Sequence, residues 1–316
     1  MSREPLALIG RMEPEETGHW LAALRKAMPD EAIEPAQQLL ADGRADGVRL
    51  AIVADPDPAQ VRRFTGLQWI HSVWAGVEGL LAEPGFAALP IVRLVDPELA
   101  RTMAEATLAW TLYLHREMPH YRLAQQASTW QPLRYRPASE RRIGLLGLGE
   151  MGRRAAASLQ AAGFPVLGWR RQAGAVPDID CRSGEDGLDE VLAGSDIVVL
   201  LLPLTSQTRH LINRERLARM PVGASLINFG RGPLVHVGDL IEALDLGRLA
   251  HAVLDVFDQE PLPADSPLWR HSGITVLPHI SAATTAQTAS AIVAGNVQRW
   301  RQTGSLPMTV DRTAGY

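Results

Sequence analysis

Short apolar runs alternate with helical patterns through the first hundred residues. Residues 17–28 repeat apolar positions at the spacing of a helix. The segment Asp55-Pro56-Asp57-Pro58 ends one apolar run, as a turn does. Four apolar runs predict strands, at residues 6–9, 48–54, 67–73 and 91–95. This part of the chain therefore predicts a small α/β domain.

A second alternating series follows a long apolar pattern over residues 99–118, which predicts one helix linking two domains, and a loop over residues 130–140. Its predicted strands are 142–146, 165–169, 196–202, 224–228, 249–254 and 274–277, and its predicted helices are 151–162, 214–220 and 237–245. This alternation predicts βαβ units on a parallel sheet that is covered on both faces. A final helix, 284–303, is expected to return to the first domain.

Composition narrows the classes of protein. The 316 residues have room for two domains, and a net charge of −4 with mixed signs argues against a nucleic-acid or anionic-membrane surface. The single cysteine, Cys181, excludes an intrachain disulfide and makes a cysteine-based metal site unexpected. No run of about 18 apolar residues predicts a membrane span, and the first apolar stretch is too short for a signal peptide. We expect a cytoplasmic protein without a metal.

The predicted strand 142–146 leads into Gly147-Leu148-Gly149-Glu150-Met151-Gly152, and a helix follows at once. In this context the glycines have separate uses. Gly147 permits a tight turn, Gly149 lets a pyrophosphate approach the backbone, and Gly152 lets helix and strand pack closely. The helix N-terminus offers free N–H groups to phosphates. The motif predicts a dinucleotide site.

The next predicted strand ends in Arg170-Arg171, where NAD enzymes place an acidic residue for the ribose hydroxyls. Arginine pairs with phosphate in a bidentate manner, so these residues favour a 2′-phosphate. We expect NADPH in preference to NADH. The alternative is a solvated basic turn.

Three chemically active residues each follow an apolar run in the last third of the chain: Arg231, Glu260 and His279. If those runs are parallel strands of one sheet, the three side chains emerge at one edge. A cation, a carboxylate and an imidazole there suggest chemistry on a small anionic carbonyl compound. The alternatives are a surface ion-pair residue, a turn residue before Pro261 and a structural histidine.

Five segments together resemble the D-isomer-specific 2-hydroxyacid dehydrogenases. They are Gly147–Gly152, Leu202-Pro-Leu-Thr-Ser-Gln-Thr208, Asn228-Phe-Gly-Arg-Gly232, Leu254-Asp-Val-Phe-Asp-Gln-Glu-Pro261 and Pro278-His-Ile-Ser-Ala-Ala283, in the family's order. The resemblance covers essentially the whole chain. It is strongest to the glyoxylate/hydroxypyruvate reductase A branch, through segments such as Ser266-Pro-Leu-Trp269 and through the missing acidic residue after the second strand.

The resemblance implies an α/β fold of two Rossmann-like lobes. A doubly wound parallel-sheet NAD(P)-binding domain (101–283) is inserted in a smaller flavodoxin-like substrate lobe (1–100 plus 284–316). The lobes are expected to close about hinges near 97–102 and 281–285.

The resemblance also implies roles. His279 would donate a proton to the carbonyl oxygen, Glu260 would orient His279 and favour its protonated form, and Arg231 would grip the substrate. The implied cofactor contacts are Gly147, Gly149, Glu150, Met151, Gly152, Arg170, Arg171, Leu202, Pro203, Thr208, Phe229 and Asp255, the last at the nicotinamide carboxamide. The implied substrate contacts are Trp74, Ala75, Gly76, Val77, Arg231 and His279. Core packing for Leu202 and a turn or capping role for Asp255 are the alternatives.

The predicted function is reduction of glyoxylate, hydroxypyruvate or a similar 2-keto acid by NADPH, in a homodimer. NADH is the alternative cofactor. A dinucleotide-sensing corepressor on the same fold, or a relative that oxidises formate or phosphite, is the alternative function. The side chain of the substrate is beyond what the sequence predicts.

Overall fold

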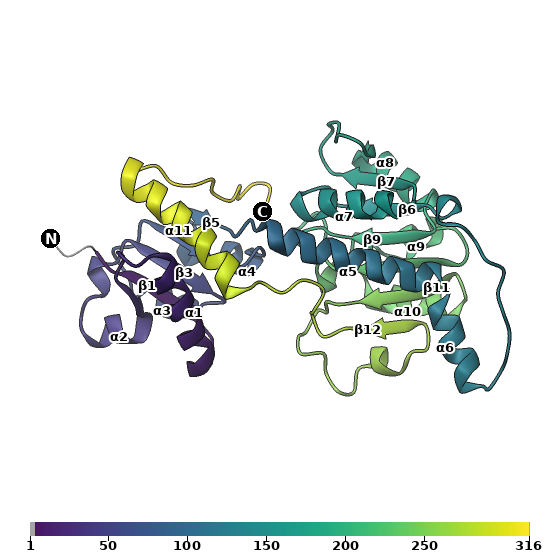
Figure 1. Cartoon of the computed structure of the whole chain (residues 1–316), viewed down its shortest axis with the longest axis horizontal. Coiled ribbons are helices and arrows are strands. Elements are labelled where there is room, and N and C mark those ends of the chain that lie inside the picture. The colour runs from purple at the N-terminus through teal and green to yellow at the C-terminus, as the bar shows by residue number, and fades with distance from the viewer. Residues whose placement is uncertain (1–3, 316) are drawn as a thin grey trace. The chain divides into compact units, whose positions relative to one another are not determined.

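The computed structural model describes residues 4–315, and the chain divides into two compact units. Unit 1 is Met1–Glu98 with Thr284–Tyr316, and unit 2 is Leu99–Ala283. Figure 1 shows the helices and strands of both units.

Unit 1 is built on a five-stranded parallel sheet in the order β2-β1-β3-β4-β5. This order is that of flavodoxin-like folds. The strands are β1 (Leu6–Gly10), β2 (Ile33–Pro35), β3 (Leu50–Ala54), β4 (Trp69–Ser72) and β5 (Ile91–Val92). The helices are α1 (Pro14–Ala27), α2 (Ala36–Ala41), α3 (Pro58–Val61), α4 (Glu78–Ala82) and α11 (Ala286–Thr303).

Two apolar clusters lie on the two faces of this sheet. On one face, Leu24 of α1 and Val293 of α11 pack with Trp69 of β4. On the other, Leu39 of α2 and Leu80 of α4 belong to the second cluster. Because both faces are covered, most strand residues are apolar, as the sequence pattern predicts, with Glu34 of β2 and His71 and Ser72 of β4 as exceptions.

Unit 2 is built on a seven-stranded parallel sheet in the order β12-β11-β10-β9-β6-β7-β8. The strands are β6 (Ile143–Leu146), β7 (Val166–Arg170), β8 (Asp180–Ser183), β9 (Ile197–Leu200), β10 (Ala224–Asn228), β11 (Leu249–Leu254) and β12 (Ile274–Val276). The helices are α5 (Pro97–His115, its first two residues in unit 1), α6 (Met118–Gln126), α7 (Glu150–Ala161), α8 (Gly184–Ala193), α9 (Arg214–Arg219) and α10 (Val237–Asp245).

Side chains of α5 and α7 pack on one face of this sheet, and side chains of α8, α9 and α10 pack on the other. The strand order reverses at β6, with β7 on one side and β9 on the other, as in a doubly wound dinucleotide-binding fold. The predicted α/β class with two Rossmann-like lobes is confirmed.

One predicted helix is wrong at its end. Residues 99–118 were expected to form a single helix, but α5 ends at His115 and α6 begins at Met118. Glu117 between them has φ 55°, in the left-handed region, which interrupts the helix. The apolar pattern continues across the break because Met118 fits it. A continuous helix would nevertheless lose a hydrogen bond here, because Pro119 has no N–H to donate to the carbonyl of His115 four residues earlier.

Candidate active site

The three strand-end residues follow neighbouring strands of unit 2. Arg231 lies three residues beyond β10, Glu260 lies beyond β11, and His279 lies three residues beyond β12. These strands are adjacent and parallel, so their carboxyl ends meet at one edge of the sheet. Ligands of open α/β sheets bind outside this edge.

Glu260 and His279 are brought into direct contact. The His279 Nδ1–H donates to Glu260 Oε2 at 2.7 Å, and the other carboxylate oxygen accepts the backbone N–H of Phe257 at 2.9 Å. The His279 side chain is 51% exposed, so the pair is open to a ligand. With Nδ1 bonded to the carboxylate, Nε2 is the ring atom left for proton transfer.

The Arg231 turn is shaped by Asn228, the last residue of β10, which is 1% exposed. Its side chain accepts the N–H of Gly230 at 3.2 Å and donates to the carbonyl of Arg231 at 2.9 Å. A Cβ on Gly232 would lie 2.1 Å from the carbonyl carbon of Phe257, so this turn packs on the segment that leads to Glu260. Asn228 opens the Asn228–Gly232 motif, but no role in shaping the turn was predicted for it from the sequence.

The glycine loop fits a dinucleotide. Gly147 has φ 104°, which is strained for other residues, and a Cβ on Gly152 would lie 1.8 Å from the Gly147 carbonyl oxygen. A Cβ on Gly149 would meet nothing within 4 Å, so the chain itself does not require glycine there. Gly149 caps α7 without any side-chain cap bond, which leaves the first-turn N–H groups to a phosphate. Glu150, the first residue of α7, pairs with Arg153, and Met151 is half-buried.

Arg170 ends β7 and Arg171 follows it, and both are partly exposed. The guanidinium of Arg171 donates to the Gln207 side-chain oxygen at 2.7 Å, which connects the turn after β7 with the turn after β9.

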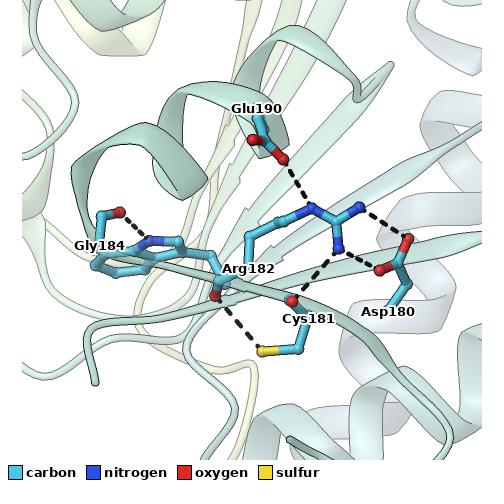
Figure 2. Close-up of polar contacts among 6 residues, drawn as sticks. Asp180, Cys181, Arg182, Gly184 and Glu190 are labelled. Carbon is cyan, nitrogen blue, oxygen red and sulfur yellow. Dashed lines mark hydrogen bonds and ion pairs between the residues drawn. The ribbon is translucent and has the colours of Figure 1, made fainter. Parts of the chain in front are cut away.

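A third arginine, Arg182 of β8, is held differently. Figure 2 shows its guanidinium between the carboxylates of Glu190 and Asp180. Its Nε donates to Glu190 Oε2 at 2.7 Å, and both Nη atoms donate to Asp180. Two carboxylates balance the charge of Arg182, so it is poorly suited to hold a phosphate.

The segment after β9 is tightly built. The Thr208 hydroxyl accepts the N–H of Thr205 and donates to the carbonyl of Pro203, each at 2.8 Å. Leu202 and Phe229 are 9% and 4% exposed. These residues follow β9 and β10, beside the glycine loop that follows β6. Thr208 thus stabilises the backbone of the segment after β9 through its hydroxyl group.

Asp255 directly follows β11 and is 2% exposed. Its two carboxylate oxygens accept the backbone N–H groups of Ile280 at 2.7 Å and Ser281 at 2.9 Å. The sequence predicted a ligand contact or a turn role for this residue, and the observed bonds belong to the turn that carries His279.

In unit 1, residues 73–77 form the turn between β4 and α4. The N–H of Trp74 donates to Ser72 Oγ at 3.0 Å and its carbonyl accepts the N–H of Leu94. Among the described residues, the N–H groups of Ala75, Gly76 and Val77 have no hydrogen-bond acceptor. Three successive free N–H groups suit an anion. The Trp74 side chain is 41% exposed.

His71 lies just before that turn and is fully buried. Its Nδ1–H donates to the carbonyl of Ser72, and its Nε2 accepts from Asn296 of α11, each at 2.9 Å. Burial lowers the pKa of His71 to about 4, so the imidazole is neutral near pH 7.

Residues 4–315 contain no group of three or more histidine, cysteine or acidic side chains placed to hold a metal ion. Within the same range, no helix combines the length and the apolar character needed to cross a membrane.

The doubly wound fold and the glycine loop define a dinucleotide-binding protein. The family profile for the D-isomer specific 2-hydroxyacid dehydrogenase NAD-binding domain matches residues 108–281. The chain belongs to this family, as its motifs suggested, and the sequence resemblance to the glyoxylate/hydroxypyruvate reductase A branch is confirmed as well.

Solved structures of similar proteins cover the whole length. A D-isomer specific 2-hydroxyacid dehydrogenase from Xanthobacter autotrophicus Py2, in complex with NADPH and MES, is 37% identical over 99% of this chain and 100% of that one, with a TM-score of 0.92. An NADPH-dependent glyoxylate/hydroxypyruvate reductase from Sinorhizobium meliloti, in complex with NADP and sulfate, is 31% identical over 99% and 100%, with a TM-score of 0.91. A probable 2-hydroxyacid dehydrogenase from Rhizobium etli CFN 42, with NADP, HEPES and L(+)-tartaric acid, is 30% identical over 99% and 100%, with a TM-score of 0.90.

These findings establish an enzyme rather than a sensor without catalysis: an NAD(P)-dependent 2-hydroxyacid dehydrogenase.

Proposed function

We propose that this enzyme reduces a small 2-keto acid, such as glyoxylate or hydroxypyruvate, with NADPH as the preferred cofactor. The observation that carries the proposal is the 2.7 Å contact of Glu260 with His279 at the same sheet edge as the glycine loop. Bound nicotinamide supplies the hydride chemistry. Unit 2 is the NAD(P)-binding domain of this proposal, and unit 1 is the substrate lobe.

His279 is the proton donor of this proposal. Its Nε2 delivers the proton to the carbonyl oxygen as C2 is reduced, and the carboxylate of Glu260 holds the ring in place through Nδ1. Arg231, on the neighbouring strand end, binds the carboxylate and the carbonyl oxygen of the substrate and so stabilises the negative charge that develops there. The free N–H groups of Ala75, Gly76 and Val77 bind the substrate carboxylate, with Trp74 beside it.

The cofactor site of the proposal follows the carboxyl ends of β6, β7, β9, β10 and β11. The α7 N-terminus, with Glu150 and Met151 in its first turn, receives the pyrophosphate. Arg170 and Arg171 receive the 2′-phosphate. Leu202, Pro203, Thr208 and Phe229 line the nucleotide. Each oxygen of Asp255 keeps a lone pair for the nicotinamide carboxamide.

NADP or NADPH in the three similar structures supports the cofactor preference, and the name of the Sinorhizobium reductase supports the substrates. A homodimer is also part of the proposal. It is supported by exposed apolar side chains on α6 and the segment after it.

The decisive experiment is a substrate panel assayed with NADPH and with NADH. It contains glyoxylate, hydroxypyruvate, pyruvate and 2-ketobutyrate in the reducing direction, with formate and phosphite in the oxidising direction with NADP⁺. We expect the highest kcat/KM for glyoxylate or hydroxypyruvate with NADPH. Turnover of formate or phosphite alone would contradict the proposal.

Two variants locate the chemistry within that panel. His279→Ala should lower kcat about 100- to 10,000-fold, as expected for loss of a general acid, while NADPH binding stays near normal. Unchanged turnover in His279→Ala would contradict the assignment of His279 as proton donor.

The double variant Arg170→Ser with Arg171→Ser should lower the ratio of kcat/KM for NADPH to kcat/KM for NADH about 10- to 100-fold, because charge-assisted bonds to the 2′-phosphate are lost. The matched control, Arg182→Ser, should leave that ratio unchanged because its charge is already balanced.

A further inference from the structure

The turn that carries His279 has an unfavourable backbone conformation. His279 has φ 55°, in the left-handed region that side chains with a Cβ adopt at a cost. Ile280, the next residue, has a side chain that is 60% exposed, so apolar burial of that side chain does little to hold the turn. Something else must fix the backbone on which the imidazole is mounted.

The carboxylate of Asp255 is the group in contact with this turn. Its Oδ1 accepts the Ile280 N–H at 2.7 Å and its Oδ2 accepts the Ser281 N–H at 2.9 Å. Successive backbone N–H groups that converge on one anion form a concave site, and charge-assisted bonds are stronger than neutral ones. The carboxylate thus stabilises the backbone shape that begins at His279.

Asp255 is itself fixed by the sheet. Its N–H donates to the carbonyl of Asn228 at 3.1 Å, and the preceding residue, Leu254, accepts the N–H of Leu277 at 2.9 Å. Leu254 also pairs with Val276 in the β11–β12 ladder. Asp255 is therefore part of the sheet core, whereas the 279–281 turn that it holds begins at exposed residues.

We propose that Asp255 is the positioning residue of the proton donor: its carboxylate holds the 279–281 turn so that the His279 ring meets Glu260 and presents Nε2 to the substrate. The proposal rests on the proposed role of His279. It differs from a contact to the nicotinamide because it acts in the free enzyme, before any cofactor binds.

The test compares Asp255→Asn with a matched control, Asp239→Asn. Asp239 also accepts a backbone N–H in unit 2, from Arg214 at 2.8 Å, but it lies on α10, and its side chain pairs with Arg214 and His236 rather than with the 279–281 turn. In Asp255→Asn the side-chain NH₂ faces one backbone N–H, so one of the two bonds to the turn is lost. Amide hydrogen exchange of the free enzyme, keto-acid kinetics and NADPH titration are measured for both.

For Asp255→Asn we expect the Ile280 and Ser281 amides to exchange ~10-fold faster in the free enzyme. We expect kcat to fall about 100-fold, the cost of a misplaced catalytic group, with a much smaller change in the KM of the keto acid and in the NADPH Kd. Asp239→Asn should leave all four quantities near the wild-type values.

Unchanged exchange at Ile280 and Ser281 in Asp255→Asn would overturn the proposal. So would a loss confined to NADPH affinity, which would leave Asp255 as a cofactor contact only. If Asp255→Asn does not fold, the unaltered free enzyme still decides: rapid exchange of the Ile280 amide, as in an open loop, would overturn the proposal. Normal turnover of His279→Ala would instead remove the proton-donor role, while the exchange data would still report on the turn.

Discussion

At the residue scale, three buried polar side chains stabilise backbone turns that carry the proposed chemistry. Asn228 bonds to both ends of the Arg231 turn, Asp255 accepts two N–H groups after His279, and His71 donates to the carbonyl just before the 73–77 turn. All three are 2% exposed or less. Removing one partner would leave other buried polar groups unpaired, which costs more than the bond itself contributes.

The buried imidazole of His71 makes an acid sensitivity of unit 1 predictable. Its pKa is about 4 in the folded protein because burial disfavours the charged ring, against 6.5 for the free side chain. Below pH 6.5 the unfolded chain therefore binds a proton that folded His71 does not. Stability is lost as the pH falls from 6.5 to about 4, by roughly 3 kcal/mol at about 1.4 kcal/mol per pKa unit.

Urea unfolding of the enzyme at pH 7 and pH 4.5 gives the free energy of unfolding at each pH and so measures this effect. The variant His71→Gln keeps a donor and an acceptor but does not titrate, so the difference in unfolding free energy between the two pH values should shrink. His19→Gln, which removes an exposed histidine of α1, is the control and should behave as wild type. An identical pH dependence in His71→Gln and wild type would contradict the prediction.

The sequence identified the catalytic candidates but not the residues that hold them. Arg231, Glu260 and His279 follow apolar runs, so their common edge follows from the parallel sheet. Asn228 is an ordinary amide at a strand end, and its use depends on a three-residue turn that no periodicity encodes. The bonds of Asp255 join residues 25 and 26 positions apart, and only the folded sheet brings them together.

At the element scale, alternating apolar runs predicted most of the two sheets because most strands are buried on both faces. The short edge strand β2, Ile33–Pro35, was not predicted. The strand β8, Asp180–Ser183, was missed because it lies at the sheet edge and carries polar side chains. The helix α6 was missed because it buries no residue and therefore shows no apolar stripe. Elements at an edge or outside the core leave little periodic signal.

The start of α7 separates two uses of glycine. Gly152→Ala should cost about 1–3 kcal/mol or more of unfolding free energy, because its Cβ would lie 1.8 Å from the Gly147 carbonyl oxygen. Gly149→Ala should leave stability within about 0.5 kcal/mol, because its Cβ meets nothing and its backbone is extended, with φ −72° and ψ −163°. The same Cβ would occupy the space of the pyrophosphate, so NADPH binding should weaken tenfold or more, by about 1.4 kcal/mol.

Chemical denaturation and NADPH fluorescence titration of both variants measure these effects. Gly149→Ala with wild-type affinity for NADPH would contradict the assignment of this loop to the pyrophosphate. Loss of stability in Gly149→Ala would mean that the fold, rather than the ligand, requires glycine there.

At the scale of the whole molecule, the proposed homodimer needs a surface, and unit 2 offers one. Leu123 and Met118 on α6 are 48% and 41% exposed, and Trp130 and Tyr135 beyond it are 97% and 68% exposed. A groove of about 480 Å³ lies between α6 and residues 128–132. A surface with both a projecting indole and a groove can pair with its own copy about a two-fold axis.

We expect the wild-type enzyme to sediment at twice the 34.4 kDa mass of the chain at micromolar concentration. Leu123→Glu with Trp130→Glu should shift the equilibrium to monomer, weakening association about 30-fold or more, because exposed aromatic residues commonly supply most of the binding energy. The control is Leu246→Glu, equally apolar and 75% exposed but located at the end of α10, and it should remain dimeric. A monomeric wild-type enzyme would contradict the proposed homodimer. A double variant that remains dimeric would show that the interface lies on another face, because an interface at α6 would bury two unpaired charges per copy.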